Sequence, residues 1–266
     1  MSATIETQMP LDSVAARWDA VLGQYVKTPD DDDIGGRNMF TDYHVGVALF
    51  DYAGLLANDE DRAALTDYIA HLATQTPSDM EDADAIAYWA NLYNALTVDV
   101  VLQNYPVSSI REIGGGLFSK GPWGRKIITV ESEHLSLDNI EHDIMRKQFP
   151  SPLIHYMVNC ASIGCPNLKA GLWRAETLDA DRELAAKAFI NSPRGVGLQK
   201  RGLKLSSIYK WFKEDFGGSK KNVLAHIEEY AEGDLAAAIE NGMMIGDYYY
   251  DWALNDIIAE NEVEVE

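Results

Sequence analysis

Residues 83–104 constrain the fold of this chain more than any other segment. Their apolar side chains recur three and four positions apart, the spacing of one flank of an α-helix, and Pro106 follows their end. This flank comprises Ile86, Trp89, Ala90, Tyr93, Leu96, Thr97 and Val100. We therefore expect a long amphipathic helix that packs against the core of a globular domain.

Two amides, Asn91 and Asn94, lie three positions apart on one face of this helix. Asparagine is a poor guest in a helix interior, because its side chain competes with the backbone for hydrogen bonds. Such amides either fasten buried backbone or contact a ligand, for example an oxyanion. Both roles stay open, and we count Asn91 and Asn94 among the candidate substrate-binding residues.

The remaining periodicity predicts an α+β fold, with a small, largely antiparallel sheet flanked by helices. Acidic residues at 30–33 and glycines at 114–116 indicate loops. No repeat of solenoid period is visible. Helices are expected at 11–25, 59–74, 178–191, 221–230 and 234–241, a further helix after the Ser136 cap, a short aromatic helix at 206–216, strands at 126–130, 154–160 and 248–254, and a hairpin at 195–205.

Charge and composition exclude several classes of protein. The formal net charge is −20 and the pI is about 4.6, so the chain repels phosphate backbones and anionic headgroups. Its apolar runs fall short of a bilayer span. We expect neither nucleic-acid binding nor membrane insertion. Residues 1–10 lack a cationic start and an apolar stretch, which predicts a cytoplasmic protein, or a periplasmic or secreted one if a leader has been removed.

The best candidate for chemistry is a thiol. Cys160 ends the predicted strand 154–160, and loops that follow strands commonly carry function. A thiol needs a base or a positive field to ionise. His142 lies on the preceding helix and could fold back onto the thiol across the turn at 150–152. His155 is offset by five positions from Cys160, which predicts the opposite face of the strand and a place in the core.

Glu141 is the natural carboxylate to orient the His142 imidazole. Adjacent helical residues diverge by about 100°, however, so Glu141 could act on a neighbouring group instead. Asn159, directly before Cys160, is a further candidate contact for substrate.

Two other uses of the cysteines stay open. Cys160 and Cys165 are the only cysteines, and their spacing is wider than a zinc knuckle or a Cys-x-x-Cys redox motif. A mixed metal site with His142 and His155 and a redox pair are the alternatives. We expect no metal and no cofactor.

Three ordered motifs resemble the family called domain of unknown function 547. They span residues 87–96, 135–146 and 155–160, with weaker echoes at 205–212 and 250–256. The resemblance covers 84–256, which leaves 1–83 as a helical extension packed on the core and 257–266 as an acidic tail. It implies a fold related to papain-like thiol hydrolases in permuted order, with a site of Glu141, His142 and Cys160. Cys165 resembles a position that some members fill with serine, and Ala90 and Ala161 stand where larger aliphatics and glycine are commoner.

The function expected from these residues is that of a cysteine-dependent hydrolase or acyltransferase acting on a peptide, isopeptide or related amide. His142 takes the proton of Cys160, the thiolate attacks a carbonyl, and Asn159, Asn91 or backbone N–H groups beyond Cys160 stabilise the oxyanion. We predict that Cys160, rather than Cys165, is the nucleophile, because a strand end holds a sulfur more rigidly than a loop.

Whether the chain turns over substrate is left undecided by the sequence. The alternative is a noncatalytic binding or scaffolding domain that retains a papain-like pocket, with Trp89, Tyr93, Trp211 and Trp252 as its contact surface. A metal-dependent hydrolase is the third hypothesis.

Overall fold

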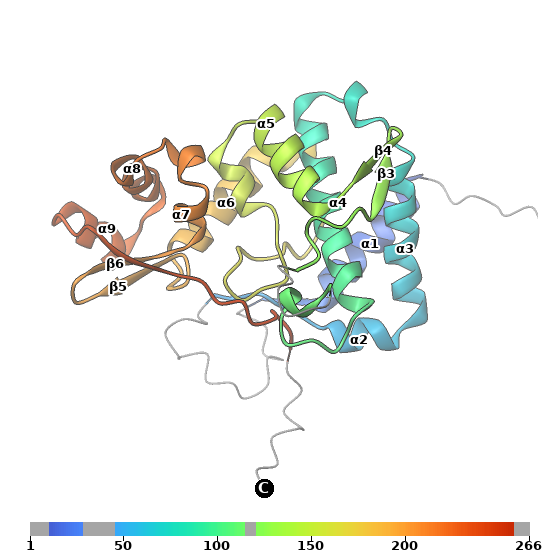
Figure 1. Ribbon diagram of the computed structural model, residues 1–266, viewed down its shortest axis with the longest axis horizontal. Coiled ribbons are helices and arrows are strands. Elements are labelled where there is room, and N and C mark those ends of the chain that lie inside the picture. Colours follow the sequence, from blue (N-terminus) through green and yellow to red (C-terminus); the bar gives the residue numbers. More distant parts are fainter. Residues whose placement is uncertain (1–10, 29–45, 115–120, 258–266) are drawn as a thin grey trace, which may run out of the picture.

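The computed structural model describes residues 11–28, 46–114 and 121–257 (Figure 1). The predicted acidic loop at 30–33, most of the glycine connection at 114–116, residues 1–10 and the acidic tail beyond residue 257 lie outside these ranges.

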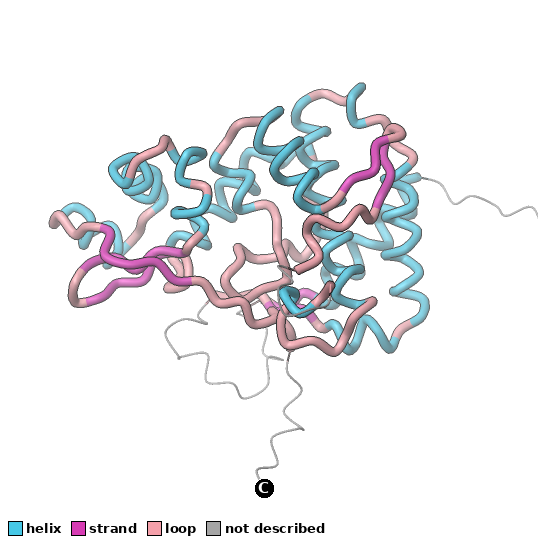
Figure 2. The backbone as a smooth tube through the Cα atoms, in the orientation of Figure 1, coloured by secondary structure: helices cyan, strands magenta, loops and turns pink. Residues whose placement is uncertain are grey.

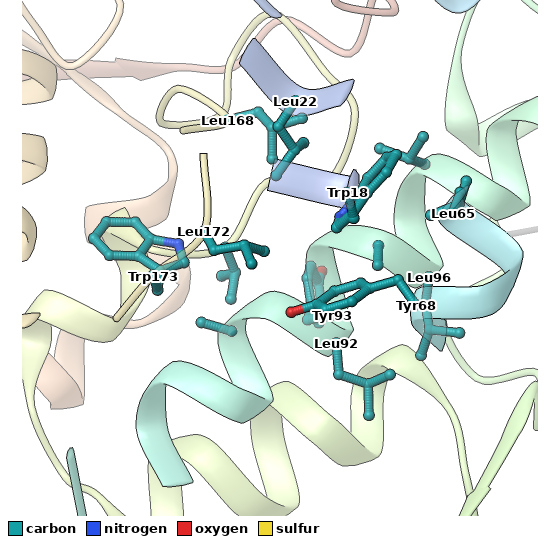
Figure 3. Packing of buried hydrophobic residues seen from close by; sticks show 14 of the residues in the cluster. Trp18, Leu22, Leu65, Tyr68, Leu92, Tyr93, Leu96, Leu168, Leu172 and Trp173 are labelled. Carbon is teal, nitrogen blue, oxygen red and sulfur yellow. The ribbon is translucent and has the colours of Figure 1, made fainter. Parts of the chain in front are cut away.

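One half of the molecule is built around α4, Asp82–Leu102, as the periodicity predicts. Nearly every side chain from Ala85 onward is buried, so α4 is enclosed on all sides rather than on one flank. The predicted helices α1 (Leu11–Tyr25) and α3 (Asp59–Ala73) pack there too, with α2 (Tyr52–Ala57) between them in sequence. Figure 3 shows side chains from α1, α3, α4 and the 168–173 loop meeting in this core.

The other half is a smaller lobe with its own apolar cluster (Figure 1). Its helices confirm the predicted order. They are α6 (Leu178–Ile190), α7 (Ile208–Trp211), α8 (Lys220–Tyr230) and α9 (Gly233–Glu240). The chain then returns beneath the larger half, where residues 250–257 cross the molecule.

The α+β class is confirmed, but the described residues form three small sheets rather than one (Figure 2). Two are antiparallel pairs, β1 with β2 and β3 with β4, and in the third β6 pairs antiparallel with β5 and parallel with β7. The strands are β1 (Val26–Lys27), β2 (Leu49–Phe50), β3 (Ile128–Val130), β4 (Glu133–Leu135), β5 (Val196–Gln199), β6 (Gly202–Ser206) and β7 (Ile245–Tyr249).

The prediction of a strand at 154–160 is wrong. Residues Pro152–Tyr156 form a 3₁₀-helix, and the chain then runs as a loop to Cys160. Ser151 caps this turn by accepting a hydrogen bond from the backbone of Leu153, and a proline at the first position favours a helical turn. The predicted strand at 248–254 is also displaced, because β7 ends at Tyr249.

The helix after Ser136 is confirmed, but it is of an unusual type. Residues Asn139–Met145 form a π-helix that continues into α5, Arg146–Gln148. The Asn139 N–H donates to Ser136 Oγ at 3.2 Å, and the Asn139 side chain accepts from the Ser136 N–H at 3.1 Å. π-helical segments are rare and are frequently found at functional sites. Within the described ranges, no helix is long and apolar enough to cross a membrane.

Candidate active site

The loop that carries Cys160 is closed by the side chain of Asn159. Asn159 Oδ1 accepts from the Ala161 N–H at 2.8 Å, and its Nδ2 donates to the Pro166 carbonyl at 2.8 Å. The Asn159 N–H in turn donates to Asn94 Oδ1 on α4 at 2.9 Å. One buried amide therefore ties both ends of the cysteine loop together and fastens them to the central helix.

Ala161 has a φ of +59°, in the left-handed region that glycine prefers. This agrees with the expectation that glycine is commoner at this position, because the tight turn after Cys160 demands that backbone conformation.

The other side of the loop rests on residues 251–253. Ile163 N–H donates to the Ala253 carbonyl at 2.8 Å, and Gly164 N–H donates to the Asp251 carbonyl at 2.9 Å. A Cβ at Gly164 would lie 2.9 Å from the Asp251 backbone and 3.0 Å from the Tyr250 ring. The absence of a side chain at Gly164 therefore lets this segment approach closely and bring Tyr250 to the cysteines.

The two cysteine sulfurs lie side by side, with Sγ atoms 2.6 Å apart. Tyr250 OH lies 3.1 Å from Cys160 Sγ and 3.0 Å from Cys165 Sγ, while Ser162 Oγ lies 3.2 Å and 3.5 Å from them. The Cys160 N–H also donates to Cys165 Sγ at 3.0 Å. Cys165 is buried and Cys160 is partly exposed, so Cys160 is the more accessible of the two residues.

These contacts divide the charge unequally between the thiols. Burial alone would raise the pKa of Cys165, but hydrogen bonds from Cys160, Tyr250 and Ser162 lower it to about 6. The pKa of Cys160 is raised well above its ordinary value, because its thiol is hydrogen-bonded to Cys165 and is desolvated by the surrounding side chains. The two thiols thus titrate as a pair, and the hydrogen bonds favour the negative charge on Cys165 over Cys160.

His142 and Glu141 sit on the π-helix at the edge of the same cavity. His142 Nδ1 lies 3.8 Å from Glu141 Oε1 and 3.4 Å from an Arg146 nitrogen, and its Nε2 lies 3.7 Å from Asp138 Oδ1. The imidazole is 36% exposed. In the described part of the chain no hydrogen bond joins His142 to Cys160, so the two share a cavity without direct contact.

The cavity has a volume of about 260 Å³ and a largely aromatic wall. Trp211 lies 5.7 Å from Trp252 and 4.9 Å from Tyr250 between ring centroids, and Trp123 packs edge-on to Trp252 at 5.6 Å. The cavity is lined by Tyr93, Trp123, Asp138, Glu141, His142, His155, Val158, Cys160, Cys165, Pro166, Ile208, Trp211, Phe212, Tyr250 and Trp252. Of the four aromatic residues expected at a contact surface, Tyr93, Trp211 and Trp252 belong to it.

The amides on α4 hold backbone. Asn91 donates to the Trp173 carbonyl and accepts from the Trp173 N–H, both at 2.9 Å, and Asn94 donates to the Met157 carbonyl at 2.9 Å. Of the two roles that the sequence left open, the structure shows the fastening one. A substrate contact by Asn91, Asn94 or Asn159 stays a prediction, and their amide atoms already have backbone partners.

His155 is buried, as predicted, but it is not remote from the cysteines, since it lines the same cavity. Its Nε2 lies 2.7 Å from Asp215 Oδ2, and its ring stacks on Phe212 at 4.4 Å. Asp215 also accepts from Arg146 at 2.6 Å and 3.1 Å. Although burial opposes ionisation, the bonds from His155 and Arg146 hold the pKa of Asp215 below its usual range. The argument that placed His155 on an opposite strand face was wrong, because no strand forms there.

Sequence reasoning missed Tyr250, Ser162 and Asp215. Tyr250 begins the weak motif at 250–256, which gave a signal but no role. Ser162 and Asp215 gave no signal in the sequence. Ser162 matters through its contacts with Cys160 and Tyr250, and Asp215 through its contacts with Arg146 and His155, and these contacts form only in the folded chain. Across the three described ranges, no group of three or more His, Cys, Asp or Glu side chains is arranged to hold a metal ion.

Comparison with known proteins gives one match. No curated protein and no solved structure matches the chain. Residues 77–190 match the family described as protein of unknown function, DUF547, and this segment includes the loop of Cys160 and the π-helix of His142. Residues 77–190 are therefore similar to the DUF547 family, in agreement with the resemblance seen in the sequence motifs.

Proposed function

We propose that the protein is a cysteine-dependent hydrolase or acyltransferase that acts on a peptide, isopeptide or related amide. One observation carries this proposal: a partly exposed thiol, an imidazole with a neighbouring carboxylate, and a phenol all open into one cavity. Thiol, base and hydrogen-bond donor are the parts that acyl transfer to sulfur requires.

Cys160 is the proposed nucleophile, because it is the more exposed of the two sulfurs. As its Sγ bonds to the carbonyl carbon, its proton moves to Cys165 Sγ, 2.6 Å away. The π electrons of the carbonyl move onto oxygen. Cys165 thus replaces His142 as the nearest acceptor of the nucleophile's proton.

Tyr250 is the proposed donor to the oxyanion. Its hydroxyl already lies 3.1 Å from Cys160 Sγ, so it stays close to a carbonyl bonded to that sulfur. Asn159 is less suited, because its side chain is committed to Ala161 and Pro166.

His142 is proposed to complete the cycle. It gives a proton to the departing amine when the C–N bond breaks, then removes one from the water or amine that attacks the thioester. Glu141, whose Oε1 lies 3.8 Å from Nδ1, is placed to orient the imidazole during these steps. The order of His before Cys supports a distant, permuted relation to papain-like hydrolases, although a turn rather than a helix follows Cys160.

The aromatic wall and the acidic rim of Asp138 and Glu141 favour an uncharged or cationic substrate with a flat apolar group. Together with the net charge of −20, they disfavour nucleic acid. We propose an amide-containing substrate whose acyl group rests against Trp211 and Trp252.

The experiment uses p-nitrophenyl acetate, whose good leaving group needs no acid. The parent should release a burst of nitrophenolate and carry an acetyl group on Cys160 by mass spectrometry. Cys160→Ser should lose the burst. His142→Gln should keep the burst but slow the following steady release by about 10²-fold or more, because water then lacks its base.

His134→Gln is the matched control, since His134 lies on the exposed hairpin β3–β4, outside the cavity lining. It should behave as the parent. If the parent neither acetylates nor labels with iodoacetamide faster than an ordinary thiol, the hydrolase proposal fails and the noncatalytic binding domain takes its place.

A further inference from the structure

The second cysteine does more in this site than a neighbouring serine could. Cys165 Sγ lies 2.6 Å from Cys160 Sγ, and both thiols are free. A hydroxyl at position 165 could share a proton with Cys160, but only a second sulfur can bond to it covalently. Little movement separates this contact from a bond between the sulfurs.

The contact is imposed by the surrounding fold. The Cys165 N–H donates to the Ser162 carbonyl at 3.0 Å, which turns the chain back on itself. The side chain of Asn159 spans this turn from Ala161 to Pro166, and residues 251–253 hold its outer edge. Because the loop is already ordered, joining the two sulfurs costs little further chain entropy.

Access to the two sulfurs differs. Both cysteines line the cavity, but Cys160 is partly exposed there, whereas Cys165 is only 4% exposed. An external disulfide therefore reaches Cys160 first, and the inner sulfur is placed to displace it. The hydrogen bonds that favour the Cys165 thiolate provide the attacking group for that second step.

We propose that Cys160 and Cys165 form a reversible internal disulfide by exchange with a small disulfide such as oxidised glutathione. Cys160 Sγ attacks one glutathione sulfur while its proton passes by way of Cys165 Sγ to the departing glutathione, so that a mixed disulfide forms and one glutathione thiol is released. Cys165 Sγ then attacks Cys160 Sγ, which forms the internal bond and releases the second glutathione. The protein loses two electrons and two protons, and oxidised glutathione is reduced to two thiols. We infer further that the Cys160–Cys165 disulfide inactivates the nucleophile Cys160, an inference that rests on the proposed function.

The test equilibrates the full chain with oxidised and reduced glutathione in varied ratio, quenches with acid and alkylates the remaining thiols. The parent should lose two hydrogen atoms in intact mass, take up no alkyl group, and yield a linked peptide containing both cysteines. Cys165→Ser should stop at one glutathione on Cys160. Cys160→Ser should gain glutathione at least tenfold more slowly, because the remaining sulfur is buried.

Urea-unfolded parent chain is the control for the role of the fold. The folded chain should form the internal bond at a lower proportion of oxidised glutathione than the unfolded chain does. Equal proportions, or a folded parent that stops at the mixed disulfide, would overturn the proposal. Mass is read independently of turnover, so a disulfide that forms in a protein without a nitrophenolate burst refutes the proposed function and leaves this inference standing.

Discussion

Replacing Asn94 with alanine tests whether the central helix holds the cysteine loop. Asn94 is 7% exposed and makes two hydrogen bonds of 2.9 Å, one to the Met157 carbonyl and one from the Asn159 N–H. Truncation leaves both backbone groups buried without these partners. Each such group costs about 1–3 kcal/mol, so we expect a loss of roughly 2–6 kcal/mol in the free energy of unfolding.

The measurement is urea denaturation followed by circular dichroism, with a thermal melt beside it. At roughly 2–4 °C per kcal/mol for a domain of this size, the midpoint of the melt should fall by about 4–24 °C. Asn104→Ala is the control, because Asn104 is exposed just beyond the end of α4 and its side chain makes one hydrogen bond, to the Val100 carbonyl. It should change stability by less than about 0.5 kcal/mol.

A result that separates stability from reactivity would also be informative. If Asn94→Ala melts with the parent but loses the nitrophenolate burst, the amide serves substrate and the fastening argument is refuted. Asn91→Ala gives a second measurement, since Asn91 makes the same pair of bonds to Trp173.

Three further predictions concern the site. The pKa of Cys165 is about 6 in the folded chain and 9.0 ordinarily, so between pH 6 and pH 9 the folded state binds fewer protons than the unfolded state. The free energy of unfolding, measured in urea, should therefore rise from pH 6 to pH 9. Cys165→Ser should flatten this rise. Gly164→Ala should lower the melting temperature and weaken the contact of Tyr250 with the thiols. The midpoint of iodoacetamide labelling should then shift to higher pH. An unchanged midpoint would count against the role of Gly164 in bringing Tyr250 to the cysteines. Asp215→Asn should lower the free energy of unfolding at pH 7 by about 1–3 kcal/mol in urea denaturation, because buried His155 loses its carboxylate partner. The difference in stability between variant and parent should shrink in acid, because Asp215 of the parent then takes up a proton.

Local sequence determined most of the helices. The periods at 11–25, 59–74 and 178–191 match α1, α3 and α6 within a residue at each end, because each segment carries its own apolar stripe and end signals. The motif at 155–160 and the preceding helix also placed Cys160 and His142 among the candidates, since residue type limits which side chains can act as nucleophile and base.

Local sequence was insufficient where an element depends on a partner. Residues 154–160 are apolar enough for a buried strand, but a strand requires a neighbour for its backbone. The backbone of Met157 and Asn159 instead bonds to Asn94, more than sixty residues away in the chain.

The chemistry of the site likewise depends on contacts between residues that are distant in the chain. Cys160 and Cys165 are visible in the sequence, yet nothing there shows that their sulfurs lie 2.6 Å apart or that hydrogen bonds lower the pKa of Cys165. Tyr250 reaches them only because the chain returns from the small lobe and passes against Gly164. A pKa depends on every donor within hydrogen-bond reach, and only the folded chain brings these donors together.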